Sequence, residues 1–132
     1  MGSFMSKLEL DGEIYTILEC NYGFEKRTDS TSKPSGETLG GEIELTIESR
    51  GKMNLVEWVL SPDKEKSGVI IFYRRDGMSK LFDIHFDKAY CIKFHEKFNS
   101  TGNEPMQITL TIAAKTLKFN NHIGYTRDWV II

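Results

Sequence analysis

The sequence lacks an excess of positive charge and long apolar runs, two features that would indicate particular classes of function. It carries no excess of positive charge, because 17 basic residues stand against 19 acidic ones for a net charge of −2. Nucleic-acid binding draws much of its affinity from neutralised phosphates, so this balance disfavours a nucleic-acid partner. No apolar run approaches the roughly 18 residues of a membrane-spanning helix, and we therefore expect no membrane insertion.

Cysteine is also scarce. Cys20 and Cys91 lie far apart and show no CxxC spacing. The N-terminal residues show no apolar segment after a basic stretch, which a secretory signal peptide would have. We therefore expect a chain that is made in the cytoplasm with both thiols reduced and no disulfide between them.

Motifs that carry chemistry are missing too. The glycines at positions 36, 40 and 41 are not followed by the Lys-Ser/Thr of a phosphate-binding loop. A metal site built from His85, His95 and His122 is an alternative, but solvent-facing strand residues explain these histidines better. Cys91 and His95 would stand about 13 Å apart along a strand, too far for direct proton transfer. We predict no catalytic residue, no cofactor and no metal, and hence no enzyme.

What the sequence does contain is alternation of apolar and polar residues, which is typical of β-strands with one buried face. Residues 42–48 are the clearest case, since glutamates occupy one face and isoleucines and leucine the other. From Glu13 to Phe24 we expect the even positions to form one apolar inward face, which would bury Cys20. Further strands are predicted at residues 7–10, 68–74, 80–86, 90–94 and 107–115, with hairpin turns at Asp11-Gly12 and Asp76-Gly77.

One segment has helical spacing instead. Between Met53 and Leu60 the large apolar residues recur at helical intervals, with Asn54 as a candidate N-cap and Glu57 three residues later. We predict one helix here, anchored to a sheet by Trp58. Eight or so short strands, one helix and no β-α-β alternation predict a mainly β fold: an antiparallel two-sheet β-barrel with one flanking α-helix, in a single domain over residues 1–132.

Residues 28–41 are almost free of apolar side chains, and we expect an irregular loop there. Loops of this length usually have a function. The residues to which we assign a contact role are Thr28, Asp29, Ser30, Thr31, Ser32, Lys33, Pro34, Ser35, Gly36, Glu37, Thr38 and Leu39.

Three segments resemble the tube protein family of the bacterial type VI secretion system, Hcp or TssD, in the form found in Bacteroidota. They are Pro34-Ser35-Gly36 with Thr38 and Gly40 to Ser49; Leu55-Val56-Glu57-Trp58; and Phe86, Ala89-Tyr90, Phe98 to Gly102, Pro105-Met106 and Leu110 to Ala114. Lys7-Leu8, Asp11-Gly12 and Trp129 also fit, so the resemblance runs over nearly the whole chain. Val56 departs from the Phe expected in the helix motif, and the ending Val-Ile-Ile also departs from the family.

The resemblance implies a non-catalytic structural subunit. Six copies would form a ring, and rings would stack head to tail into a tube inside a contractile sheath. The implied partners are further copies of the chain, the sheath, spike and baseplate proteins, and effector proteins carried in the lumen. The protein would be cytoplasmic before firing and then secreted without a signal peptide, with the loop at residues 28–39 placed between rings.

A small-ligand-binding β-barrel is the alternative. An eight-stranded barrel can hold one small molecule, and the aromatic side chains expected to point inward could line a pocket or simply fill the core. Those side chains are Tyr22, Phe24, Phe82, Phe86 and Phe94. A ring would have a mass near six times 15.2 kDa, whereas a binding barrel would be a monomer or dimer.

Overall fold

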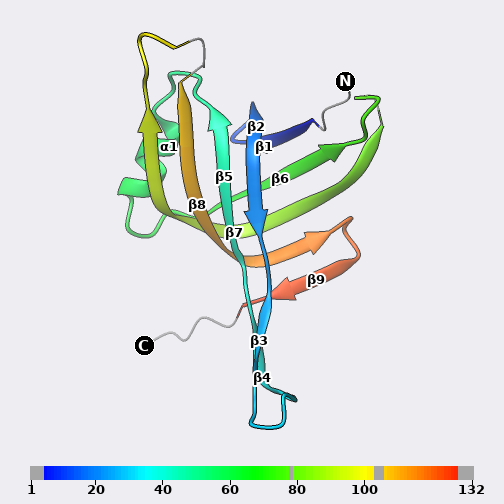
Figure 1. Cartoon of the computed structure of the whole chain (residues 1–132). Coiled ribbons are helices and arrows are strands. Elements are labelled where there is room, and N and C mark those ends of the chain that lie inside the picture. The colour runs from blue at the N-terminus through cyan, green and yellow to red at the C-terminus, as the bar shows by residue number, and fades with distance from the viewer. Residues whose placement is uncertain (1–4, 78, 103–105, 128–132) are drawn as a thin grey trace.

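The computed structural model describes residues 5–77, 79–102 and 106–127, which form nine strands and one helix (Figure 1). Trp129 and Pro105 of the resemblance lie outside the described residues. In chain order the elements are β1 (Ser6–Leu10), β2 (Glu13–Tyr22), β3 (Glu25–Thr28), β4 (Pro34–Leu39), β5 (Glu42–Glu48), α1 (Asn54–Leu60), β6 (Lys66–Tyr73), β7 (Lys80–Lys97), β8 (Gln107–Phe119) and β9 (Ile123–Thr126).

Six strands close into a barrel. The sheet runs β5-β2-β1-β6-β7-β8, and antiparallel pairing of β5 with β8 closes it. β9 extends the sheet beyond β8, while β3 and β4 form a separate two-stranded sheet that projects from the barrel (Figure 1). The predicted fold class, an antiparallel β-barrel with one flanking helix, is confirmed.

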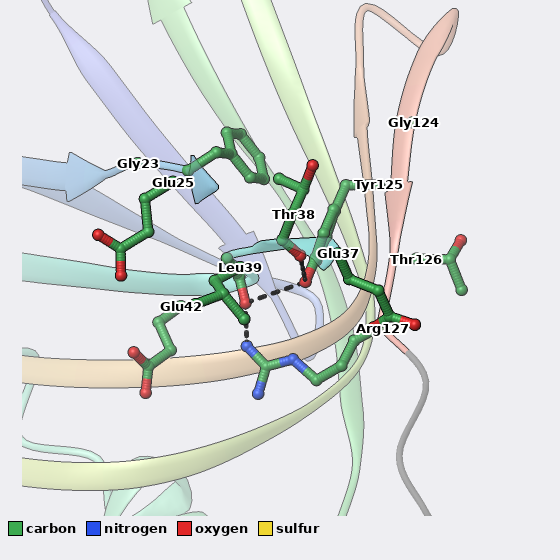
Figure 2. A pocket seen from close by; sticks show the side chains of 12 residues that line it. Gly23, Glu25, Glu37, Thr38, Leu39, Glu42, Gly124, Tyr125, Thr126 and Arg127 are labelled. Atoms are coloured by element: carbon green, nitrogen blue, oxygen red, sulfur yellow. Dashed lines mark hydrogen bonds between the residues drawn. The ribbon is translucent and has the colours of Figure 1, made fainter. Parts of the chain in front are cut away.

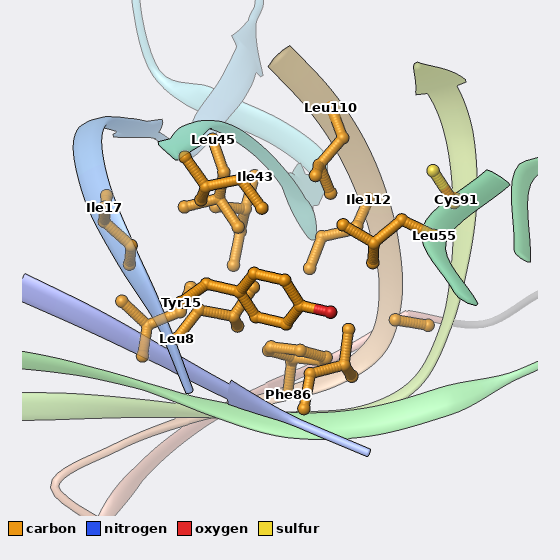
Figure 3. Close-up of a cluster of buried hydrophobic side chains, with 14 of the residues drawn as sticks. Leu8, Tyr15, Ile17, Ile43, Leu45, Leu55, Phe86, Cys91, Leu110 and Ile112 are labelled. Atoms are coloured by element: carbon orange, nitrogen blue, oxygen red, sulfur yellow. The ribbon is translucent and has the colours of Figure 1, made fainter. Parts of the chain in front are cut away.

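The barrel interior is filled by side chains from all six strands and the helix (Figure 3). Fully buried examples from different elements are Leu8, Tyr15, Ile43, Trp58 and Ile112. Each large apolar side chain buried in this way contributes roughly 1.5–3 kcal/mol relative to exposure. The barrel is therefore a packed core, stabilised mainly by the hydrophobic effect.

The predicted inward face of β2 is half wrong. Tyr15 and Ile17 are buried, whereas Ile14 and Leu18 are exposed, so the odd positions face inward in the first half of the strand. The register with β5 shifts between Ile17 and Glu19, and this bulge exchanges the two faces. After it Cys20 lies opposite the buried Leu45, as the even-position pattern predicts, but Cys20 is only partly buried.

The two strands predicted at residues 80–86 and 90–94 form one long strand, β7. The strand bends between Phe86 and Ala89. Both residues are buried, although residues three apart in a regular strand point to opposite faces. Lys88 has a left-handed backbone conformation at this bend (φ 51°), and the register with β6 shifts at the same level. A second shift, against β8, falls at Ile92, which is half exposed.

The predicted helix is present as α1, which packs against β7. The predicted N-cap is wrong: Met53 occupies that position, and its side chain makes no capping hydrogen bond. Asn54 instead accepts a hydrogen bond from the hydroxyl of Tyr15 on β2. Its amide oxygen is therefore committed to joining the helix to the barrel.

The loop expected at residues 28–41 is largely a β-hairpin, which we call the arm (residues 25–39). β3 and β4 pair antiparallel, with Glu25 opposite Leu39 and Lys26 opposite Thr38. The expectation of irregular structure is therefore wrong for Thr28 and for residues 34–39, and it holds for the turn at residues 29–33 and for Gly40 and Gly41. It failed because both faces of the arm are polar, so the sequence lacks the apolar stripe that marks a strand.

Strand β9 was not predicted. It returns through the three-residue turn Asn120-Asn121-His122, in which the backbones of both asparagines are left-handed (φ 52° and 59°). Four residues with mostly exposed side chains give little periodicity to detect. β9 matters because it brings residues 125–127 to the base of the arm.

Candidate functional site

The structure brings all twelve predicted contact residues onto the arm. Thr28 ends β3, residues 29–33 form the turn, and residues 34–39 are β4. Asp29 organises the turn, since its Oδ1 accepts hydrogen bonds from the backbone and hydroxyl of Thr31 and from the backbone of Lys33. These bonds, that from the Thr31 hydroxyl first, hold the pKa of Asp29 below its ordinary value.

The arm is exposed along its length. Every residue from Glu25 to Glu37 is exposed, and only Thr38 is half buried. Figure 1 shows the arm extending away from the barrel at the end opposite that where β7 finishes and β8 begins. Its residues therefore contribute nothing to the barrel core, which is consistent with a role in contacts with another molecule.

The returning strand of the arm is held at its base by side chains from the end of β9 (Figure 2). The hydroxyl of Tyr125 lies 3.3 Å from the carbonyl oxygen of Thr38 and 3.5 Å from that of Gly40. The guanidinium of Arg127 also donates to the Gly40 carbonyl. One residue on, the Gly41 carbonyl accepts from the backbone N–H of Ala114 on β8, at 2.8 Å.

The outgoing strand is held differently, by aromatic packing. Phe24 lies against Tyr125 and Phe119, with ring centroids 5.2 and 5.9 Å away. Tyr22 also packs on Phe119, at 5.6 Å. Tilted and edge-on pairs at these separations are the favourable arrangements for aromatic rings. Tyr22 and Phe24 were expected to point into the barrel, but they are about 40% exposed and pack at its end (39% and 42%).

Gly40 and Gly41 are required where the arm rejoins the barrel. Gly41 has φ +89°, and a Cβ there would lie 2.7 Å from Nη2 of Arg127. A Cβ at Gly40 would collide with the ring of Phe24. No other residue fits both positions without displacing the arm or its contacts.

A cavity of about 980 Å³ lies between the arm and β9. Its lining includes Phe24, Glu37 and Glu42 together with Tyr125 and Arg127 (Figure 2). Sequence reasoning missed Tyr125 and Arg127, because neither belongs to a motif. The adjacent glycines at 40 and 41 were the one available sign that backbone and side chains come close together here.

The predicted helix anchor, Trp58, is 1% exposed. Its indole Nε1 donates to the carbonyl oxygen of Lys64 at 3.0 Å, so the side chain joins the helix to the loop before β6. Lys66 Nζ lies 5.6 Å from the centre of the Trp58 ring. The energetic importance of this anchor stays a prediction.

The three histidines do not meet. His95 is exposed on β7, and His122 is exposed in the turn between β8 and β9. His85 lies instead beside Asp83, with Nε2 3.4 Å from Oδ1. Within the described residues there is no group of three or more His, Cys, Asp or Glu side chains that could hold a metal ion.

Both cysteines are free, Cys91 buried and Cys20 partly buried. Burial raises the pKa of each thiol to about 11. The Cys91 Sγ–H donates to the carbonyl of Lys93 at 3.3 Å. A reactive nucleophile needs a lowered thiol pKa, so this environment is the opposite of a catalytic one.

Comparison with known protein families identifies the family to which this sequence belongs. A sequence model of the family described as hemolysin coregulated protein Hcp (TssD) matches residues 2–130. The chain belongs to the Hcp (TssD) family. The resemblance found in the sequence is thereby confirmed. Members of the Hcp family are structural tube proteins and not enzymes. The chain therefore has a structural, tube-forming role.

Solved structures agree with the family. Hcp1 from Flavobacterium johnsoniae superposes with a TM-score of 0.85 at 28% identity, covering 93% of this chain and 99% of that one. Hcp1 from Salmonella typhimurium shares the fold at 13% identity, with a TM-score of 0.71 and coverage of 90% and 86%. A chain of the sheath-tube complex of an extracellular contractile injection system, PVC, also shares it, at 17% identity, a TM-score of 0.51 and coverage of 92% and 88%. A search of curated protein sequences gave no significant match.

Hcp proteins are secreted components of the type VI secretion system. Over the part of the chain that the structure describes, α1 is the helix present, and no helix has the length and apolar character needed to cross a membrane.

Proposed function

We propose that this Hcp protein is a subunit of the inner tube of a type VI secretion system, in which six copies form a ring and rings stack through the arm. The observation that carries the stacking role is the exposed arm, whose residues at 25–37 have no place in the core. Head-to-tail stacking needs two different surfaces at the two ends of the ring. The arm projects from one end of the barrel and would supply one of them.

The chemistry of the arm suits such a contact. Lys26, Arg27 and Lys33 lie among acidic residues and hydroxyl side chains on the arm. Polar side chains of both signs can pair with a neighbouring ring while the free subunit remains well solvated. The fixed turn at Asp29 would present these groups in one geometry.

The remaining partners follow from the same role. The sheath would surround the tube, the spike and baseplate would meet its ends, and effector proteins would travel in its lumen. The protein would be made in the cytoplasm and secreted with the tube, without a signal peptide.

A small-ligand-binding barrel is not favoured by the interior, where side chains such as Tyr15, Ile43 and Ile112 fill the space. The cavity beside the arm lies outside this core and is lined by arm and β9 residues. We therefore put forward no ligand-binding function.

Ring formation is tested by mass and imaging. The native particle should run near six times 15.2 kDa. A domain of this length is about 36 Å across, so six touching copies would leave a central hole of about the same width. A monomer in solution, or compact particles without a hole, would contradict the proposal.

Stacking is tested by shortening the arm. Replacing residues 27–37 with an Asn-Gly turn would join Lys26 to Thr38, which already pair across the hairpin. The base contacts of Thr38 and Gly40 would remain. We expect the shortened protein to form rings whose mass falls only by the residues removed, to lose ring stacking in sedimentation and electron microscopy, and to be secreted less. Normal stacking and secretion would show that the arm only connects β2 to β5 and has no contact role.

A further inference from the structure

The base of the arm is built from two kinds of contact with different mechanical properties. Aromatic packing of Phe24 on Phe119 and Tyr125 holds the outgoing strand, and such packing tolerates sliding of one ring over another. Directed hydrogen bonds hold the returning strand, where the carbonyls of Thr38 and Gly40 accept from Tyr125 and Arg127. Hydrogen bonds weaken steeply as their angles open. Any change in the arm's direction therefore breaks the second set first.

We propose that Tyr125 and Arg127 form a latch that fixes the direction in which the arm leaves the barrel, with Gly40 and Gly41 as its hinge. This inference concerns the position of the arm. It rests on the proposed function only in its consequence, that a fixed arm direction is needed for rings to stack.

The hinge has the freedom that the proposal needs. Two adjacent glycines have the widest backbone range of any dipeptide, and Gly41 already lies in the left-handed region at φ +89°. On the barrel side Gly41 is fixed, because its carbonyl accepts from the backbone of Ala114. Rotation would therefore occur between Gly40 and the barrel, at the residue whose carbonyl the latch holds.

There is also room for the arm to move. A cavity of about 980 Å³ lies between the arm and β9, so on that side the arm is supported by the contacts of Tyr125 and Arg127 at its base. Segments with exposed backbone hydrogen bonds and few buried contacts belong to the low-stability end of a protein. Without the latch, the arm would be free to lean into this space.

Arginine suits the latch better than lysine would. Its planar guanidinium presents several N–H donors in a fixed fork, and a donor with a full charge makes a stronger hydrogen bond to a carbonyl. The backbone N–H of Arg127 is itself fixed by the carbonyl of Lys115 on β8, at 2.7 Å. The backbone that carries the Arg127 side chain is therefore hydrogen-bonded to the barrel strand β8.

Hydrogen-exchange mass spectrometry on the intact ring tests the latch. Arg127→Gln replaces the charged guanidinium with a shorter neutral amide, and Tyr125→Phe removes the hydroxyl donor. We expect peptides over residues 36–41 to exchange about tenfold faster, since a charged hydrogen bond has roughly that effect on a local equilibrium. Arg127→Lys should lie between wild type and Arg127→Gln. Matched controls are Arg74→Gln, at an exposed arginine outside the arm, and Tyr22→Phe in the same aromatic group, which should exchange as wild type.

The outcomes separate the latch from the stacking role. Faster arm exchange with weaker stacking supports both, and faster exchange with normal stacking supports the latch but removes the arm from stacking. Arm exchange equal to that of the controls would overturn the latch. Loss of protection in β5 and β8 as well would also overturn it, because Arg127 would then stabilise the barrel in general.

Discussion

The hydroxyl of Tyr15 donates a hydrogen bond to Oδ1 of Asn54, 3.1 Å away, and so joins the first long strand to the helix. The Tyr15 side chain is 1% exposed, which leaves its hydroxyl with little access to water. A buried hydroxyl needs such a partner. Asn54, the first residue of the helix, therefore uses its side chain to contact the barrel, while Met53 holds the N-cap position.

Tyr15→Phe removes this bond and leaves the ring in place. We expect a loss of about 0.5–1.5 kcal/mol in the free energy of unfolding, the usual net contribution of one hydrogen bond. Urea denaturation measures it, with Tyr22→Phe as the control, since the Tyr22 ring is half exposed. Equal stability of both variants would mean that water replaces Asn54 without loss.

Trp58→Ala should destabilise the protein by about 3–5 kcal/mol, because it opens a cavity in the core and removes the indole bond to the Lys64 carbonyl. Leu60→Ala, at a side chain 75% exposed on the same helix, should change stability by less than about 0.5 kcal/mol. Similar losses in the two variants would show that Trp58 does not anchor α1.

Acid should weaken the protein partly through Asp83. The Lys80 ammonium, at 2.8 Å, and the nearby His85 hold the pKa of the Asp83 carboxyl below its ordinary 3.8. A lowered carboxyl pKa adds stability that is fully present above pH 3.8 and is lost as the pH falls through the folded-state value. Lys80→Met should therefore reduce stability at pH 6 and flatten its decline between pH 5 and 3.

Urea midpoints measured across that pH range test this dependence. Lys93→Met, at an exposed lysine further along β7, is the control and should retain the wild-type pH profile. An unchanged profile in Lys80→Met would exclude this pair as a source of acid sensitivity.

The thiols should react slowly in the folded protein. Burial raises the pKa of Cys20 and Cys91 to about 11, and only the thiolate attacks an alkylating reagent. At pH 7.5 both should react far more slowly with iodoacetamide than in urea. Cys20, the less buried, should react first; fast labelling of either cysteine in the native protein would show that its strand opens.

The sequence predicted the barrel class, and β5 shows why. Its inward residues alternate without interruption, because no bulge falls within it. In β2 and β7, by contrast, one-residue shifts exchange the faces, and the left-handed backbone of Lys88 has no sign in the side chains. Periodicity records which residues are apolar, but it does not record where the register slips.

The candidate site was located from the sequence only in outline. The polar composition of residues 28–39 marked them as free of core roles, which the exposed arm bears out, but it concealed the strands. The latch could not be found, because the partners of Tyr125 and Arg127 are backbone carbonyls. Any residue type can supply a carbonyl, so no sequence pattern marks such a partner.

The arm leaves two unpaired strand edges in solvent, whereas each of the six barrel strands has a paired strand on both sides. Exposed edges of this kind invite indiscriminate pairing and fibre growth. Charged side chains along β3 and a proline at the start of β4 oppose such pairing. Pairing through the backbone of the arm is therefore disfavoured, so any molecule that binds the arm would be recognised through its side chains.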